Sequence, residues 1–88
     1  MFEFDPEKSA ANLVKHGIDF ETAQELWQDA TAIEGETGFL AESRRLRIGR
    51  IDGKHWTAIF TDRGERIRII SARRARTIEV KAYETQEN

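Results

Sequence analysis

Arginines alternate with two aromatic residues in the second half of the chain, and this pattern is the best candidate for chemistry. Guanidinium groups bind phosphates, and an aromatic ring that stacks on a base contributes about 1–3 kcal/mol. The pattern therefore predicts a surface for single-stranded nucleic acid. The residues assigned to RNA binding are Arg45, Arg47, Trp56, Phe60, Arg66 and Arg74. The alternative is an ordinary solvated sheet face whose rings are partly covered by the last helix.

The charge is distributed unevenly along the chain. The net charge of the 88 residues is −2. Residues 1–43 carry ten acidic and two basic side chains, whereas residues 44–88 carry six acidic and twelve basic ones. This asymmetry indicates an anionic partner for the second half and a regulatory contact for the first.

RNA cleavage would need a base for the 2′-hydroxyl proton, a cation beside the phosphorus and an acid for the leaving oxygen. Arginines can supply the cation, so no metal or other cofactor is expected. The candidate catalytic residues are Lys15, His16, Arg68, Arg73 and Tyr83. His16 is also placed to cap the carbonyl groups at the end of a helix, and Tyr83 could equally anchor the last helix. His55 is interpreted as a surface residue.

Composition bounds the class of protein. Eighty-eight residues fit one domain, with disorder expected only at residues 85–88. The chain has no cysteine, and its two histidines are far apart in the sequence, which makes a metal site unlikely to form. No apolar stretch approaches the roughly 20 residues that span a bilayer. We expect a cytoplasmic protein without a membrane partner.

The N-terminal half has clear helix signals. A short strand at Phe2–Phe4 is followed by a helix that Asp5 caps and Gly17 ends. A second helix begins at Asp19. The apolar positions expected to be buried are Ala10, Leu13 and Val14 in the first helix and Phe20, Ala23, Leu26 and Trp27 in the second.

Two turns predict three antiparallel strands. Asp52-Gly53 is typical of a two-residue type I′ hairpin, which pairs Ile51 with Lys54. A three-residue loop at 62–64 would pair Thr61 with Glu65. The core face would then carry Leu46, Ile48, Thr57, Ile59, Ile67 and Ile69, and the open face Arg45, Arg47, Trp56, Ala58, Phe60, Arg66, Arg68 and Ile70.

The last helix is expected from about Ala72 to Tyr83, and it would pack through Ala75, Ile78 and Ala82. Its first turn would hold Arg73, Arg74 and Arg76, although cations are unfavourable at a helix N-terminus. A local rule broken in this way is typical of a functional site. The predicted fold is α+β, with the N-terminal helices on one face of an antiparallel sheet and a C-terminal helix.

Several segments resemble the BrnT toxin family. They are D-P-E-K-S-A-A-N-L-V-K-H-G at 5–17, I-D-F-E-T-A at 18–23, I-G-R-I at 48–51 and I-R-I-I-S-A-R-R-A at 67–75, followed by Glu79, Tyr83 and Glu84. The family-like positions are Asn12, Lys15, His16, Gly17, Ser71, Arg73, Glu79 and Tyr83.

The resemblance implies a RelE-like fold and a ribonuclease toxin of a type II toxin–antitoxin system that blocks translation. It further implies a ribbon-helix-helix antitoxin of the BrnA kind, with promoter DNA bound only through the toxin–antitoxin complex. Two other readings stay open from the residues. One is a non-catalytic basic module that binds RNA or a protein, and the other is an inactive toxin fold that serves promoter regulation.

Overall fold

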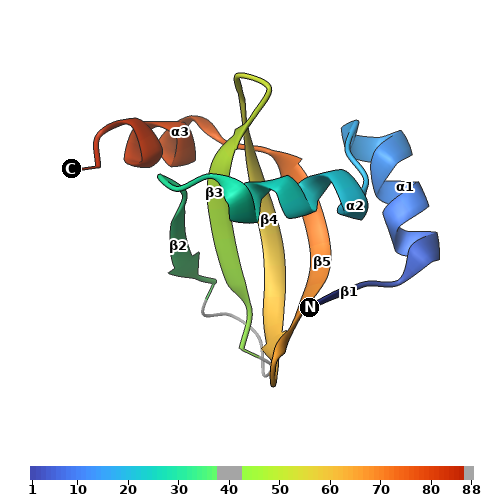
Figure 1. The fold of residues 1–88 in the computed structure, drawn as a ribbon. Coiled ribbons are helices and arrows are strands. Elements are labelled where there is room, and N and C mark those ends of the chain that lie inside the picture. The colour runs from blue at the N-terminus through green and yellow to red at the C-terminus, as the bar shows by residue number, and fades with distance from the viewer. Residues whose placement is uncertain (38–42, 87–88) are drawn as a thin grey trace.

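The computed structural model describes residues 1–37 and 43–86, and it is an α+β protein built on one five-stranded sheet (Figure 1). The strand order is β1-β5-β4-β3-β2. The elements are β1 (Phe2–Glu3), α1 (Pro6–His16), α2 (Phe20–Ala23), the 3-10 helix η1 (Gln24–Gln28), β2 (Ile33–Glu36), β3 (Arg45–Ile51), β4 (Lys54–Arg63), β5 (Arg66–Arg74) and α3 (Thr77–Glu84).

The sheet is mixed, which corrects the antiparallel prediction. β1 runs parallel to β5, with Phe2 opposite Ile67 and Glu3 opposite Arg68. The N–H of Ile67 donates to the carbonyl of Met1 at 2.8 Å. A parallel pair needs a long crossover rather than a tight turn, so no local turn signal could predict it.

The predicted starts of the first two helices and the predicted helix end at Gly17 are confirmed. The Asp5 carboxylate accepts from the N–H of Glu7 at 2.9 Å, and Pro6 begins α1. Gly17 ends α1 with φ +82°, and its N–H donates to the carbonyl of Leu13 at 2.9 Å. Asp19 caps α2 through the N–H of Thr22 at 2.8 Å.

The buried side of α1 is polar, which corrects the predicted apolar stripe. Val14 is 89% exposed and Leu13 is 49% exposed, whereas Ser9 and Asn12 are buried. The Asn12 amide donates at 2.8 Å to the carbonyls of Ile18 and of Ala72 in β5. The N–H of Ala72 approaches the Asn12 side-chain oxygen at 3.4 Å. Asn12 thus satisfies the backbone of β5 where β1 no longer pairs with it.

The β3–β4 hairpin has the predicted register. Asp52 and Gly53 adopt φ values of +52° and +78°, as a type I′ turn requires, and Ile51 lies opposite Lys54. One strand was missed: β2 pairs with β3, with Glu34 opposite Arg47. Its sequence, I-E-G-E, has little β propensity. Glu34 instead bonds Arg47 at 2.7 Å and also pairs with Arg45 across the strands.

The predicted β4–β5 register is wrong. Gly64, with φ +62°, lies in a turn that places Arg63 opposite Arg66, so β4 is longer than expected. Phe60 then lies opposite Ile69, and after a register shift Ile59 lies opposite Ser71. The shift inserts one residue into β5. Ile69 and Ala72 are both buried in the core as a result.

The helices cover the sheet face that was predicted to be open, so the assignment of faces is also wrong (Figure 1). Phe60 is 1% exposed and Ala58 is 0% exposed. Both lie beneath the N-terminal helices with Ile51 and Ala72. We call this side of the sheet the helix-covered face and the other side the far face. The far face holds Leu46, Ile48, Thr57, Ile59, Thr61 and Arg73.

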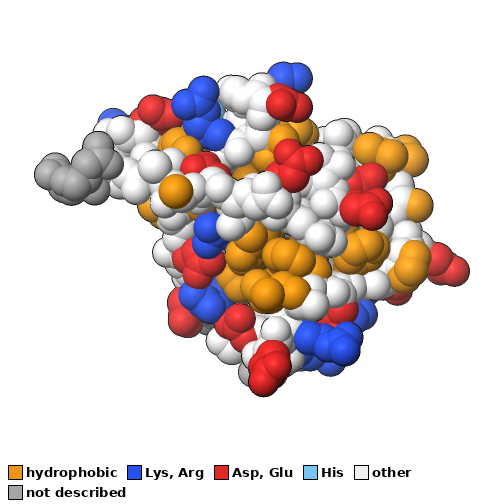
Figure 2. Space-filling view, viewed as in Figure 1, with side chains coloured by type: hydrophobic (Ala, Val, Ile, Leu, Met, Phe, Trp, Pro, Cys, Tyr) orange, Lys and Arg blue, Asp and Glu red, His pale blue; other side chains and the backbone are white. Residues whose placement is uncertain are grey.

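Small residues allow the helices to approach the helix-covered face closely. A Cβ atom on Gly49 would lie 3.0 Å from the Leu26 side chain and 3.1 Å from the Asp29 carboxylate. Because Gly49, Ala58 and Ala72 are small, η1 and α1 can pack close to the backbone of the sheet. Trp27 packs edge-to-face on Phe2 at 5.1 Å and on Phe60 at 5.0 Å. Part of this hydrophobic layer is visible below the helices in Figure 2.

The C-terminal helix is shorter than predicted, because Ser71–Arg74 belongs to β5. The chain then crosses the hairpin end of the sheet, and α3 lies beside the end of η1 (Figure 1). Its inward residues are Glu79 and Tyr83, whereas Ile78 is 76% exposed. The predicted inward packing through Ile78 and Ala82 is therefore wrong.

Disorder was expected at residues 85–88, but the structure describes Thr85 and Gln86. Gln86 donates to the carbonyl of Thr31 at 2.7 Å, and Thr85 ends α3. Residues 87–88 lie outside the described residues. No helix in the described ranges is long and apolar enough to cross a membrane.

We predict that Asn12→Ala lowers the free energy of unfolding by about 1–3 kcal/mol, because buried carbonyl groups would lose their donor. Leu13→Ala, on the same helix, should cost less than about 1 kcal/mol because that side chain is half exposed. Urea denaturation of both variants measures the difference. A larger loss in Leu13→Ala would contradict the polar packing of α1.

Candidate functional site

Glu79 holds the N-terminus of α3 against the far face. Its carboxylate receives two guanidinium hydrogen bonds from Arg73, at 2.8 and 2.9 Å, and one from the Thr57 hydroxyl at 2.8 Å. The Arg76 N–H donates to it at 2.8 Å. Burial would raise the pKa of Glu79, but these hydrogen bonds outweigh it and lower the pKa to about 2. Arg73 is thus engaged within the protein rather than at a helix N-terminus.

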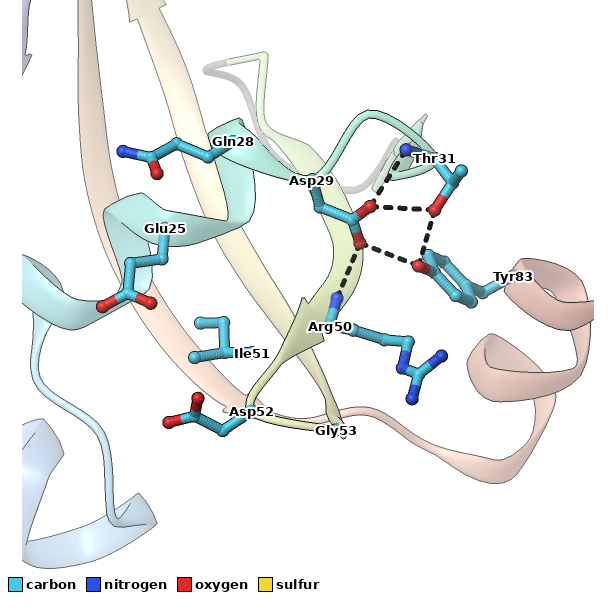
Figure 3. A pocket seen from close by; sticks show the side chains of 9 residues that line it. All are labelled: Glu25, Gln28, Asp29, Thr31, Arg50, Ile51, Asp52, Gly53 and Tyr83. Atoms are coloured by element: carbon cyan, nitrogen blue, oxygen red, sulfur yellow. Dashed lines mark hydrogen bonds between the residues drawn. The ribbon is translucent and has the colours of Figure 1, made fainter.

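Tyr83 fixes the other end of α3 (Figure 3). Its hydroxyl donates to the Asp29 carboxylate at 2.8 Å and lies 2.7 Å from the Thr31 hydroxyl. Burial and the bond to Asp29 raise the pKa of Tyr83. Burial opposes ionisation of Asp29, yet N–H donors from Thr31 and Arg50, with the hydroxyls, lower its pKa to about 2. A phenol held this way is an anchor more than a proton donor.

An open depression of about 520 Å³ lies beside this anchor. Figure 3 shows Glu25, Asp29 and Asp52 around it, with Arg50 as the basic residue of its lining. The lining is predominantly acidic, so it does not favour a phosphate.

His55 packs against α3, whereas the sequence suggested a surface residue. Its Nε2 lies 2.6 Å from the Glu84 carboxylate, and its ring packs edge-to-face on Tyr83 at 5.2 Å. The His55 side chain is only 20% exposed. Because His55 and Glu84 are 29 residues apart in the sequence, no local pattern could predict that they pair.

The arginines of the helix-covered face are neutralised by acidic residues. Arg45 bonds Asp62 at 2.7 Å and Arg47 donates to the Leu26 carbonyl at 2.8 Å; both also pair with Glu34. The two guanidinium groups lie over Phe60 and Trp27, respectively, at 5.3 and 5.4 Å from the ring centroids. The predicted open basic face therefore does not form, and Phe60 has no ring surface free for a base.

Two more residues predicted to bind RNA or to act in catalysis, Arg66 and Arg68, lie on β5 at the end of the sheet opposite to the β3–β4 turn. Arg68 bonds Glu3 at 3.3 Å, and Arg66 lies 3.9 Å from the same carboxylate. Arg66 is well exposed, with 66% of its side chain accessible. These two arginines and Tyr83 are not brought together with the remaining candidates.

A second cavity, of about 200 Å³, lies between the end of α1 and the β3–β4 hairpin, and we call it the hairpin groove. Its lining residues are Gly17, Ile18, Thr22, Ile51, Asp52, Lys54 and Trp56. The Arg74 guanidinium lies over Trp56, 5.3 Å from the ring centroid. Of the predicted residues, Trp56 lines this cavity and Arg74 lies over Trp56, while Lys15 and His16 are at the end of α1, directly before the lining residue Gly17.

The cations around the hairpin groove differ from the arginines beneath the helices. Within the described part of the chain, no ion pair includes Lys15, Lys54 or Arg74. All three side chains are exposed. Lys54 follows the Asp52-Gly53 turn directly, and only the fold brings it near α1. Unpaired cations, an aromatic wall and an adjacent imidazole are suited to hold a phosphate chain and to move a proton.

Residues 4–79 match the model of a family described as ribonuclease toxin, BrnT, of type II toxin–antitoxin system. The chain belongs to this family. The match covers both the end of α1 and β5 but stops before Tyr83 and Glu84. Among curated proteins, no relative matches the chain.

Membership of the BrnT family implies a ribonuclease toxin with a cognate antitoxin. The residues that hold RNA are not part of that finding, and the geometry of the hairpin groove provides the basis for a proposal. In residues 1–37 and 43–86, no group of three or more His, Asp or Glu side chains is arranged to hold a metal ion.

We predict that Arg73→Ala lowers the free energy of unfolding by about 2–3 kcal/mol, because it leaves the Glu79 carboxylate, 12% exposed, without its cation. Arg66→Ala removes the same charge from an exposed site and should cost less than about 0.5 kcal/mol. Chemical denaturation measures both. Equal losses would show that the Glu79 pair contributes nothing specific.

The lowered pKa values also predict acid sensitivity. The stabilisation from Glu79 and Asp29 is fully present above their ordinary pKa values of 4.5 and 3.8 and is lost as the pH falls toward about 2. Glu79→Gln should flatten the fall of the unfolding free energy between about pH 5 and 2. An unchanged slope in Glu79→Gln would contradict this role of the Glu79 carboxylate.

Proposed function

We propose that this chain is a metal-independent endoribonuclease that cleaves RNA at the hairpin groove. The observations that carry the proposal are Lys54 in the lining of the groove and Arg74 over Trp56, with His16 one residue before the lining residue Gly17, in a family of ribonuclease toxins. Every other aromatic–arginine arrangement on the sheet that the described residues form is paired with acids or buried.

The proposed reaction is a transfer within the RNA. His16 takes the proton of a 2′-hydroxyl group, and the 2′-oxygen attacks the adjacent phosphorus. Lys15, Lys54 and Arg74 stabilise the negative charge that gathers on the phosphorane oxygens. The bond from phosphorus to the 5′-oxygen breaks, and that oxygen takes a proton from an acid, either protonated His16 or water. The products are a 2′,3′-cyclic phosphate and a 5′-hydroxyl end.

We assign structural roles to three of the predicted catalytic residues. Arg73 and Tyr83 hold α3 through Glu79 and Asp29. Arg68 bonds Glu3 of β1. Each of these groups contributes to the position of its neighbours, and a substrate would have to compete with a carboxylate for each arginine. Lys54 and Arg74 form no ion pair with the described carboxylates, although Asp52 lines the same groove as Lys54.

We further propose that the cognate antitoxin is a ribbon-helix-helix protein of the BrnA kind and that the toxin acts in the cytoplasm by blocking translation. Promoter DNA would be bound only through the toxin–antitoxin complex. The RelE-like arrangement stays a proposal as well. The α+β class supports it, whereas the mixed sheet and the extra strand β2 differ from the layout expected from the sequence.

The proposal predicts that Lys15→Ala lowers RNA cleavage about tenfold or more, because a phosphorane charge loses one cation. Lys8→Ala is the matched control, since Lys8 is an exposed lysine at the opposite end of the same helix. Both are induced in bacterial cells, and new RNA 5′ ends are sequenced. Equal cleavage by the two variants would contradict the placement of the groove.

His16→Gln should lower cleavage by about 10²–10⁴-fold with little change in thermal stability, because it removes proton transfer. Ends that carry a 5′-hydroxyl group, and cleavage of RNA by the purified protein in EDTA, are expected for the metal-independent route. Growth arrest without new 5′ ends would favour a binding module. Loss of thermal stability in His16→Gln would favour the alternative role of His16 as a helix cap.

A further inference from the structure

We infer that the hairpin groove holds a single nucleobase and selects guanine through Asp52. This inference rests on the proposed function for its context, but the base subsite can be tested by binding alone. Three features of the groove carry the inference: its size and apolar walls, the position of one carboxylate, and the cations next to it.

The walls of the groove suit a flat aromatic ligand. Ile18 and Ile51 are buried core residues that reach its lining, and the partly buried Trp56 adds an aromatic side. The volume of about 200 Å³ is of the order of one nucleobase. Unpaired bases in single-stranded RNA are commonly recognised by stacking on such side chains, with hydrogen bonds to their Watson–Crick edges.

Asp52 introduces a negative charge into a groove that Lys54 also lines. Figure 3 shows its carboxylate pointing away from Arg50, and Asp52 lines the groove with Gly17 and Thr22. Within the described residues, no hydrogen bond or ion pair includes this carboxylate. It would repel a phosphate, so its favourable partner in RNA is an N–H donor.

Guanine is the base that fits this acceptor best. Its Watson–Crick edge has two adjacent donors, N1–H and the 2-amino group, which match the two oxygens of a carboxylate. Adenine and cytosine each place a ring-nitrogen acceptor beside the amino group, and uracil flanks its single N–H with two carbonyls. Lys54 and Arg74 lie next to the groove, where they can hold the phosphate attached to the selected guanosine.

The turn itself gives a second reason for an aspartate at this position. A type I′ turn needs a residue that tolerates positive φ, and Asp52 has φ +52°. Asparagine tolerates this conformation equally well. Asp52→Asn therefore keeps the turn and removes only the charge, which separates the two reasons.

The test is the binding of guanosine, adenosine, cytidine and uridine 3′-monophosphates to the purified protein, followed by the indole N–H resonance of Trp56. We expect guanosine monophosphate to bind about tenfold or more tightly than the others, as one bidentate contact would provide. Asp52→Asn should remove this preference. Glu25→Gln, which removes a carboxylate that lines the depression but not the groove, should retain it.

Two results would overturn the inference: equal affinity for the four nucleotides, or a guanosine preference that survives in Asp52→Asn. Sequencing of the 5′ ends then separates the subsite from the activity. A guanosine preference in binding with no RNA cleavage would support the subsite and refute the ribonuclease proposal. Cleavage with no guanosine preference in the binding assay would refute the subsite and leave the ribonuclease proposal intact.

Discussion

The close approach of η1 to β3 is the contact on which the rest of the structure depends. Leu26 and Asp29 reach the position where any side chain at 49 would begin, so a glycine is required there. Ala58 and Ala72, on the neighbouring strands, are also small and fully buried beneath the helices. Because the helices settle on these small residues, they cover one face and leave α3 to close part of the other.

This packing determines which charged side chains form ion pairs. The acidic first half supplies Glu3 and Glu34, which pair with arginines of β3 and β5. Arg45 and Arg47 place their guanidinium groups over aromatic rings and bond them to carboxylates. Many of these opposite charges thus pair within the chain, whereas Lys54 and Arg74 stay exposed and form no ion pair with the described carboxylates.

The polar attachment of α3 follows from the same arrangement. Little apolar surface of α3 faces the sheet, so Glu79 and Tyr83 hold it through buried hydrogen bonds. Such groups are stable only when every partner is present. Arg73 and Tyr83, which look catalytic in the sequence, both take part in this attachment, and His55 acquires a carboxylate partner that only the fold provides.

The sequence by itself determined the helix caps, the end of α1 at Gly17 and the register of the β3–β4 hairpin. Each depends on residues within a few positions of one another, where turn chemistry and backbone geometry decide the outcome. Only the tertiary structure decided which sheet face is covered, where β1 pairs, and which cations stay free of carboxylates. Those outcomes depend on contacts between distant segments, on a shifted residue in β5, and on small side chains whose importance appears only when a helix packs against them.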